Sequence, residues 1–221
     1  MPLHWRAIFF VLYPAQARGA NPGRCWNWFK HNHQERGRGE PALIAGMVRD
    51  VIERYGLDVD RVYIAGLSAG GAMAAIMGHA YPELFAAVGV HSGLRAGAAS
   101  DLPSALMAMN SGAARPAPSA QNLPTIVFHG DQDRTVHPSN GEQVVAFATA
   151  PFVERGGSAH GREYSRSIYR NAAQEVVAEH WLVHGGGHAW AGGSAAGSYT
   201  DAEGPDATEA MLRFFFANAK A

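Results

Sequence analysis

Ser68 lies in a short motif that could turn its side-chain hydroxyl into a nucleophile. The motif Gly66-Leu67-Ser68-Ala69-Gly70 fits Gly-x-Ser-x-Gly, a pattern that holds a serine in strained backbone geometry on a sharp turn between a strand and a helix. A β-branched and apolar run at residues 62–65 precedes it, and an Ala- and Met-rich helical pattern follows. We therefore predict a strand, a turn that exposes Ser68 Oγ, and a helix whose N-terminal N–H groups face the reaction site.

The glycines of this motif have a steric reason. A side chain at Gly66 or Gly70 is expected to collide with the neighbouring strand or helix. Because the chain holds 26 glycines, the five-residue pattern could also occur by chance. The strand and helix patterns on either side favour a functional turn.

A serine hydroxyl is a weak nucleophile until a base accepts its proton, and the base needs an acid that orients it. In folds with this turn, an acid and then a histidine follow the serine along the chain, each on a loop after a strand. Asp131 and Asp133 lie just past a strand-like run at residues 124–128, and His188 lies just past another at residues 175–183. The chain therefore offers two candidate acids and one candidate base in that order.

Of the two acids, we favour Asp133. The His-Gly-x-x-Asp spacing that begins at His129 puts Asp133 a full turn beyond the strand end, whereas Asp131 sits where an aspartate often stabilises a turn. His188 could instead be a solvated loop histidine, but the three glycines at residues 185–187 would let the backbone bring its ring close to another loop. Asp131 stays open as the alternative acid.

The elements that must position these side chains alternate between helix and strand. Helices are expected at residues 40–55, from the serine turn to about 79, and at 104–109, 140–149 and 206–218. Strands are expected at 62–65, into which residues 58–64 lead, and at 85–91, 124–128, 163–169 and 175–183. The last two strands are expected to form a hairpin, and residues 16–39 a long loop. This order predicts a single α/β domain over residues 1–221, with a mainly parallel, doubly wound sheet and helices on both faces.

The composition argues against several partner classes. The chain has 221 residues, of which 47% are hydrophobic and 17% charged, and its formal net charge is −1. No run of Lys or Arg stands out, so a nucleic-acid partner is disfavoured. The longest apolar run, residues 7–13, is too short to span a bilayer. Cys25 is the only cysteine, which excludes an intrachain disulfide.

The apolar run at residues 7–13 allows two interpretations. Arg6 before it and Ala15-Gln16-Ala17 after it imitate a signal peptide with its cleavage site. The run before Pro14 also fits a buried strand. We favour the strand, because the apolar segment is short for a signal peptide and the charged region before it is weak.

Eleven histidines raise the question of a metal site. His180, His184 and His188 are spaced four apart, which on a helix would place them on one face. Residues 175–183 have a strand-like pattern instead, and four strand residues span about 13 Å, too far for His180 and His184 to share an ion. We therefore expect no metal.

Three tryptophans could line the site. Trp190 is two residues from His188, and together with Trp26 and Trp28 it could form an aromatic wall for a substrate. The alternative is ordinary packing in the core.

Several motifs together resemble those of the polyhydroxybutyrate depolymerase-type esterases, a branch of the α/β-hydrolase fold that also includes feruloyl and acetyl-xylan esterases. The motifs are Leu12-Tyr13-Pro14, Cys25-Trp26-Asn27-Trp28-Phe29, Gly66-Leu67-Ser68-Ala69-Gly70-Gly71, Val90-His91-Ser92-Gly93, Phe128-His129-Gly130-Asp131, Val136-His137-Pro138 with Asn140-Gly141, and Gly187-His188-Ala189-Trp190. The resemblance implies hydrolysis of carboxylic esters by Ser68, Asp133 and His188, no cofactor, and usually an extracellular setting.

The resemblance has one departure. Such enzymes carry further strands and a His-Gly-Cys loop before the segment that corresponds to residues 8–14, and that loop supplies one oxyanion N–H. This sequence shows no such loop after Met1, so Ala69 N–H is expected to be the remaining donor, and losing one donor costs about 10²–10³ in kcat. The missing cysteine would be the usual partner of Cys25, which is then expected to be a free thiol.

Two functional hypotheses follow. The first is a serine esterase that acts on short-chain acyl, polyhydroxyalkanoate, or feruloyl and acetyl esters. The second is a catalytically weak hydrolase-fold protein that binds a polymer or a partner through its Trp-rich surface. An exposed sheet edge at residues 8–13 would be prone to pair with another copy, so we also expect a dimer or larger assembly through that edge or through the aromatic loop.

Overall fold

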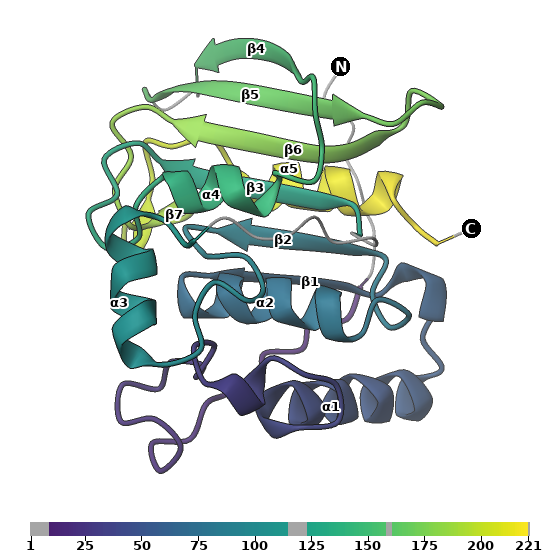
Figure 1. Cartoon of the computed structure of the whole chain (residues 1–221). Helices are drawn as coiled ribbons and strands as arrows, with labels where there is room; N and C mark the ends of the chain where they lie inside the picture. The colour runs from purple at the N-terminus through teal and green to yellow at the C-terminus, as the bar shows by residue number, and fades with distance from the viewer. Residues whose placement is uncertain (1–8, 115–122, 158–160, 221) are drawn as a thin grey trace.

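The computed structural model of the protein describes residues 9–114, 123–157 and 161–220. Its centre is a six-stranded sheet in the order β1-β2-β3-β6-β5-β4 (Figure 1). β1, β2, β3 and β6 run parallel to one another. β5 is antiparallel to β6, and β4 is antiparallel to β5. The strands are β1 (Tyr63–Leu67), β2 (Ala87–His91), β3 (Thr125–Gly130), β4 (Phe152–Gly157), β5 (Glu163–Arg170) and β6 (Val176–Val183).

Helices cover both faces of this sheet, as expected. α2 (Ala69–Ala80) and α4 (Ser139–Val144) lie on one face, and α5 (Ala207–Ala217) lies on the other (Figure 1). α1 (Gly39–Tyr55) packs beside α2, and α3 (Leu102–Ser111) lies near the carboxyl ends of the parallel strands. The remaining elements are the 3₁₀ turns η1 (His31–His33) and η2 (Val59–Arg61) and a small sheet of β7 (Trp190–Ala191) and β8 (Thr200–Asp201).

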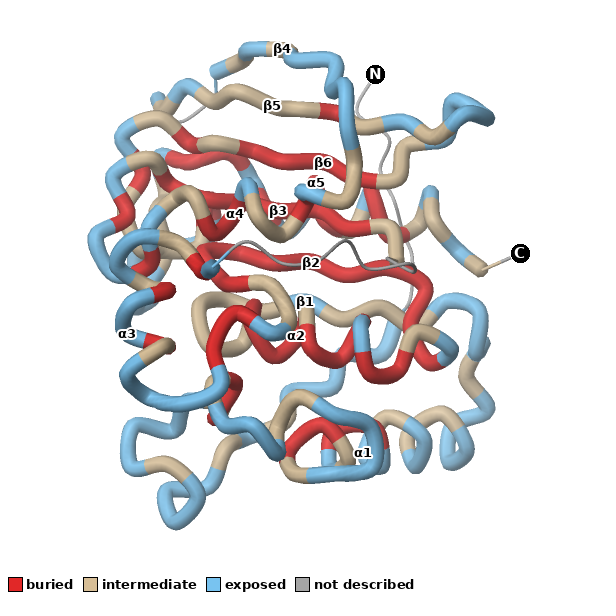
Figure 2. The backbone as a smooth tube through the Cα atoms, in the orientation of Figure 1, coloured by how far each residue is buried: buried red, intermediate tan, exposed pale blue. Residues whose placement is uncertain are grey.

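β3 shows how the strands divide the core between the two layers of helices. Ile126 and Phe128 pack in the cluster that contains α5, whereas Val127 between them packs with residues of α2 and with Val145. Alternate residues of a strand point to opposite faces. Every residue of β2 and β3 is buried, which explains why both strands read as continuous apolar runs (Figure 2).

The helix and strand predictions are confirmed in kind but not at every boundary. α3 is longer than expected because Asp101 caps it with a reciprocal hydrogen-bond pair to Ser104. α4 ends at Val144, short of the expected residue 149. β4 was not anticipated, because it is an edge strand rich in exposed residues and carries two glycines, so its sequence has no apolar signal.

The predicted buried strand at residues 9–13 is wrong. These residues form no strand, and their side chains are 40% to 85% exposed, from Leu12 to Tyr13; Ile8 lies outside the described residues. Phe9 contacts the ring of Phe216, and Phe10 contacts the ring of Tyr55. An apolar run becomes a strand only where a neighbour pairs with its backbone, and this run contacts helix side chains instead.

The long loop before α1 is confirmed, and Glu40 holds it in place. Glu40 is buried in the first turn of α1. Its carboxylate accepts hydrogen bonds from Asn27 N at 2.7 Å, Asn27 Nδ2 at 2.6 Å and Gln16 Nε2 at 2.6 Å. The motif around Cys25 is therefore fixed by one carboxylate. Cys25 itself is exposed and unpaired.

None of the described helices is both long and apolar enough to cross a bilayer.

Candidate active site

Ser68 lies between β1 and α2 in a backbone conformation that is rare for a residue with a side chain. Its φ is 57° and its ψ is −119°, and such conformations cost about 1–3 kcal/mol. Its N–H donates to the carbonyl oxygen of His91 at 2.8 Å, which ties the turn to the end of β2. Ala69 is the first residue of α2, so its N–H is among those that have no partner within the helix. The predicted strand, turn and helix are confirmed.

The steric role predicted for the glycines of the motif is confirmed for Gly66, but the prediction for Gly70 is wrong. A Cβ on Gly66 would overlap the backbone carbonyl group of Gly70. A Cβ on Gly70 would meet nothing within 4 Å, whereas a Cβ on Gly71 would lie 2.9 Å from Gly66 O and 3.1 Å from His91 O. Because a helix turns about 100° per residue, Gly71 rather than Gly70 faces β1 and β2.

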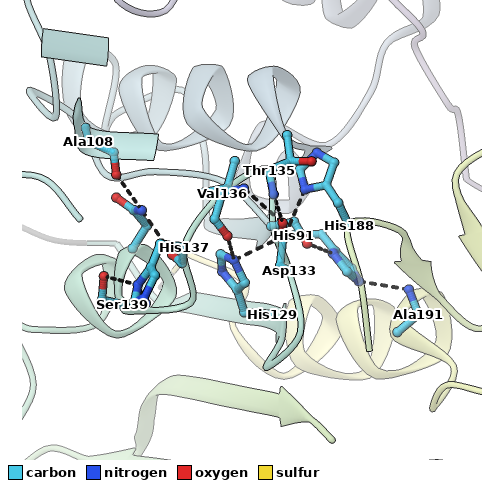
Figure 3. A network of polar contacts seen from close by, with 12 residues as sticks. His91, Ala108, His129, Asp133, Thr135, Val136, His137, Ser139, His188 and Ala191 are labelled. Atoms are coloured by element: carbon cyan, nitrogen blue, oxygen red, sulfur yellow. Dashed lines mark hydrogen bonds and ion pairs between the residues drawn. The ribbon is translucent and has the colours of Figure 1, made fainter. Parts of the chain in front are cut away.

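Asp133 has a fully buried carboxylate that is surrounded by donors (Figure 3). Oδ1 accepts from the backbone N–H groups of Thr135 and Val136, both at 2.9 Å. Oδ2 lies 2.8 Å from His188 Nδ1 and 3.4 Å from His129 Nε2. Burial raises the pKa of Asp133, but the hydrogen bonds from the two histidines and from the two backbone N–H groups outweigh it and hold this pKa well below its usual range.

His188 faces Asp133, as its position after β6 predicted. Its Nδ1 must donate to the ionised carboxylate, which leaves Nε2 as the ring nitrogen free to accept a proton in the neutral tautomer. The loop that carries His188 comes very close to the end of β3: Gln132 N–H donates to Gly186 O at 2.9 Å, and a Cβ on Gly130 would overlap that oxygen. The glycines therefore permit the approach of the two loops.

His129 supports Asp133 from behind. Its Nε2 lies 2.8 Å from the carbonyl oxygen of Val136, which can only accept, so Nε2 carries the proton. The same nitrogen is 3.4 Å from Asp133 Oδ2, and the His129 side chain is fully buried. The sequence signal for this contact is the His-Gly-x-x-Asp spacing, which puts His129 near enough to Asp133 to affect it.

Asp131 belongs to a second chain of polar contacts. Its Oδ2 lies 3.0 Å from His184 Nδ1, its Oδ1 accepts from Gly185 N at 2.8 Å, and His184 Nε2 lies 2.8 Å from Ser165 Oγ. These contacts place a serine, a histidine and an aspartate in series. Ser165 lies within β5, with no helix starting after it, so it lacks the N-terminal N–H groups that α2 offers beside Ser68.

The chain shares its sequence pattern with a known protein family. The sequence pattern of the family described as Esterase PHB depolymerase matches residues 3–166. The chain belongs to this family. The family assignment agrees with the resemblance noted in the sequence, and relatives in the family are named as carboxylic ester hydrolases.

Two curated relatives illustrate the similarity. Poly(3-hydroxyalkanoate) depolymerase C of Paucimonas lemoignei is 31% identical over 211 residues, which cover 83% of this chain and 50% of that protein. Feruloyl esterase B of Neurospora crassa is 28% identical over 229 residues, which cover 94% of this chain and 72% of that protein. The chain thus spans only half the length of the depolymerase.

The solved structures confirm the fold. The acetyl xylan esterase from Aspergillus awamori superposes with a TM-score of 0.67 at 22% identity, covering 88% of this chain and 74% of that one. The expected α/β-hydrolase fold of this family member is therefore correct.

An aromatic wall made by Trp26, Trp28 and Trp190 would need exposed rings, whereas all three residues are buried or half-buried. Trp28 is only 5% exposed and packs in the core beside α1 and α2. Trp190 is half-buried: its ring stacks on His91, and its Nε1 donates to Thr208 Oγ1 at 3.1 Å. Trp26 is also half-buried. Of the three, Trp190 is the one adjacent to the His188 loop.

The three histidines of the metal alternative have separate surroundings. His180 is buried on β6, whereas His184 contacts Asp131 and His188 contacts Asp133. In the part of the chain that the structure describes, no group of three or more His, Cys, Asp or Glu side chains is arranged to hold an ion.

Proposed function

We propose that this member of the Esterase PHB depolymerase family is a serine esterase with Ser68 as nucleophile, His188 as base and Asp133 as the acid that orients the base. One observation carries the proposal. His91 accepts a hydrogen bond from Ser68 N through its carbonyl and another from Ala191 N through its ring, both at 2.8 Å. The serine turn and the loop of His188 therefore meet at His91. Figure 3 shows the Asp133–His188 pair close to the ring of His91.

The reaction follows from these groups. His188 Nε2 takes the proton from Ser68 Oγ as that oxygen attacks the ester carbonyl carbon. Ala69 N–H, at the positive end of α2, stabilises the oxyanion. His188 then gives its proton to the leaving alcohol, and a water attacks the acyl-enzyme in the same way to release the acid. Asp133 stays ionised throughout, consistent with its lowered pKa.

The substrate class is carried over from the relatives, whose names include a poly(3-hydroxyalkanoate) depolymerase, a feruloyl esterase and an acetyl xylan esterase. We propose a small or polymeric carboxylic ester as substrate, without a cofactor and in an extracellular setting. The alternative, a weak enzyme that binds polymer through exposed tryptophans, loses support because every tryptophan that the structure describes is buried or half-buried.

The experiment compares Ser68→Ala with Ser165→Ala, using p-nitrophenyl acetate and butyrate. Ser68→Ala is expected to lower kcat by at least about 10⁴-fold, because the nucleophile is lost. Ser165→Ala makes the same chemical change at a serine that also contacts a histidine, and it is expected to leave kcat within about 3-fold, because Ser165 lacks helix N–H groups beside it.

Equal rates for Ser68→Ala and the unmodified protein would contradict the proposal. A large loss in Ser165→Ala alone would move the nucleophile to β5.

A further inference from the structure

We propose that His91 is a positioning residue that holds the serine turn and the His188 loop at a fixed separation. It occupies the last position of β2, and the mechanism above gives its side chain no chemical step. The inference rests on the proposed function for its kinetic consequence, whereas its structural part can be tested without any activity.

The backbone of His91 fixes the serine turn. His91 pairs with Leu67, the last residue of β1, in the parallel register of the sheet. Its carbonyl oxygen then accepts from Ser68 N at 2.8 Å. The serine turn is therefore anchored to the end of β2 by Ser68, the residue directly after the last pair of β1 and β2.

The ring of His91 fixes the other loop. Ala191 N–H donates to Nε2 at 2.8 Å, three residues after His188. Because a backbone N–H can only donate, Nε2 carries no proton, and the neutral ring must hold its proton on Nδ1. Nδ1 lies 3.1 Å from Ser92 Oγ, which can accept a hydrogen bond from the Nδ1–H group. One tautomer satisfies both contacts.

The surroundings keep the ring neutral. His91 is 1% exposed, and burial, followed by the nearby His129 and His188 rings, lowers its pKa to about 3, against the opposing effect of Asp133. A second proton would have to occupy Nε2, where it would face the N–H of Ala191. The ring is therefore neutral, and an acceptor for Ala191, at pH 7.

The ring also sets a spacing. It stacks between Phe128 of β3, with centroids 5.7 Å apart, and Trp190, with centroids 5.0 Å apart. Trp190 directly precedes Ala191, so the ring of His91 holds two consecutive residues of this loop, Trp190 by stacking and Ala191 by the hydrogen bond. A displacement of about 1 Å between nucleophile and base can cost about 10²-fold in rate, so a single buried ring controls the geometry of the site.

The first test measures the tautomer of His91 directly. In the unmodified protein labelled with ¹⁵N, the imidazole nitrogen shifts are expected to show a protonated Nδ1 and an unprotonated Nε2 at pH 7. The Ala191 amide is expected to exchange its hydrogen slowly. A proton on Nε2, or a rapidly exchanging Ala191 amide, would overturn the inference whether or not the protein hydrolyses esters.

The second test compares two replacements of the ring. His91→Phe keeps an aromatic ring but removes the acceptor, whereas His91→Gln removes the ring but places an amide oxygen near the position of Nε2. His91→Phe is expected to lower kcat by about 10- to 100-fold with little change in KM, because positioning and not binding is lost. His91→Gln is expected to keep kcat within about 5-fold.

Hydrogen exchange separates this result from a general loss of structure. The Ala191 amide should lose protection in His91→Phe and keep it in His91→Gln, while amides of β3 stay protected in both. Unchanged kcat and unchanged Ala191 protection in His91→Phe would overturn the inference. If the unmodified protein shows no esterase activity, the proposed function fails, but the exchange pattern still decides the role of His91.

Discussion

At the scale of single residues, two aspartates on one short loop differ in their surroundings. The Asp133 carboxylate is fully buried and accepts from backbone N–H groups and from His188, whereas the Asp131 carboxylate is 29% exposed and contacts His184. A buried carboxylate with a lowered pKa can stabilise an imidazolium because it remains ionised when the ring takes a proton. Asp133 therefore has the environment that the proposed acid needs.

We predict that Asp133→Asn lowers kcat by about 10³–10⁴-fold, because an amide cannot replace the charge and places an NH₂ group among donors. Asp131→Asn is the matched control, with a loss of about 10-fold or less. Steady-state kinetics of both variants, with thermal unfolding as a check on folding, decide between them. The reverse order of effects would make Asp131 the acid and leave Asp133 a structural residue.

At the scale of elements, the junction of β1 and α2 depends on which glycine faces the sheet. A Cβ on Gly66 would overlap the backbone of Gly70, so the strand end and the first turn of the helix would have to separate. A Cβ on Gly70 meets open space within α2. The two glycines of the same motif thus have opposite tolerance for a methyl group.

We predict that Gly66→Ala destabilises the protein by about 1–3 kcal/mol, because the added Cβ has no room against backbone atoms. Gly70→Ala should be neutral or stabilising by up to about 1 kcal/mol, since alanine favours the helix. Urea unfolding monitored by circular dichroism measures both. Equal destabilisation of the two variants would mean that Gly70 is also tightly packed.

At the scale of the whole molecule, exposed apolar side chains lie at the edge of the sheet that β1 forms. Residues 9–13 are exposed, and Phe10 contacts Tyr55 of α1. On α1, Leu43 is 66% and Met47 36% exposed, and their four-residue spacing places them on one face of the helix. Tyr55, the last residue of α1, is 54% exposed. Apolar patches of this kind often bind another protein surface. We keep the proposal of self-association, through this patch instead of through a paired strand.

We predict that the protein is a dimer or larger assembly at micromolar concentration and that Phe10→Asp shifts it toward monomer, because a charge would be buried in the contact. Phe152→Asp makes the same change at an exposed phenylalanine on β4, at the opposite edge of the sheet, and should leave the assembly unchanged. Sedimentation velocity measures all three. A monomeric unmodified protein would contradict the proposal, and an effect of Phe152→Asp alone would move the contact to β4.

Local chemistry explains which features could be predicted from the sequence. The serine turn is encoded by adjacent residues, because Gly66, Ser68 and the helix after them act within one turn of chain. The two-sided burial of β2 and β3 follows from their continuous apolar runs. The hairpin of β5 and β6 follows from the turn residues between the two strands.

The failures have an equally physical cause. The apolar run at residues 9–13 has the composition of a strand, but a strand exists only when another backbone pairs with it. β4 has the opposite property, since pairing with β5 makes a strand of a segment whose side chains are mostly exposed. Apolar composition alone therefore predicts neither burial nor strand formation, because both depend on which other segment packs or pairs with the run.

The amino-acid sequence by itself determined the fold class, the serine turn and the order of the proposed acid and base, because each depends on neighbouring residues or on apolar runs. Only the tertiary structure decided that Asp133 and not Asp131 faces His188, that His129 contacts the acid from behind, and that His91 contacts both the serine turn and Ala191, which lies 100 residues after it in the chain. These contacts depend on where the strands end in space, and that position is set by packing of the whole sheet.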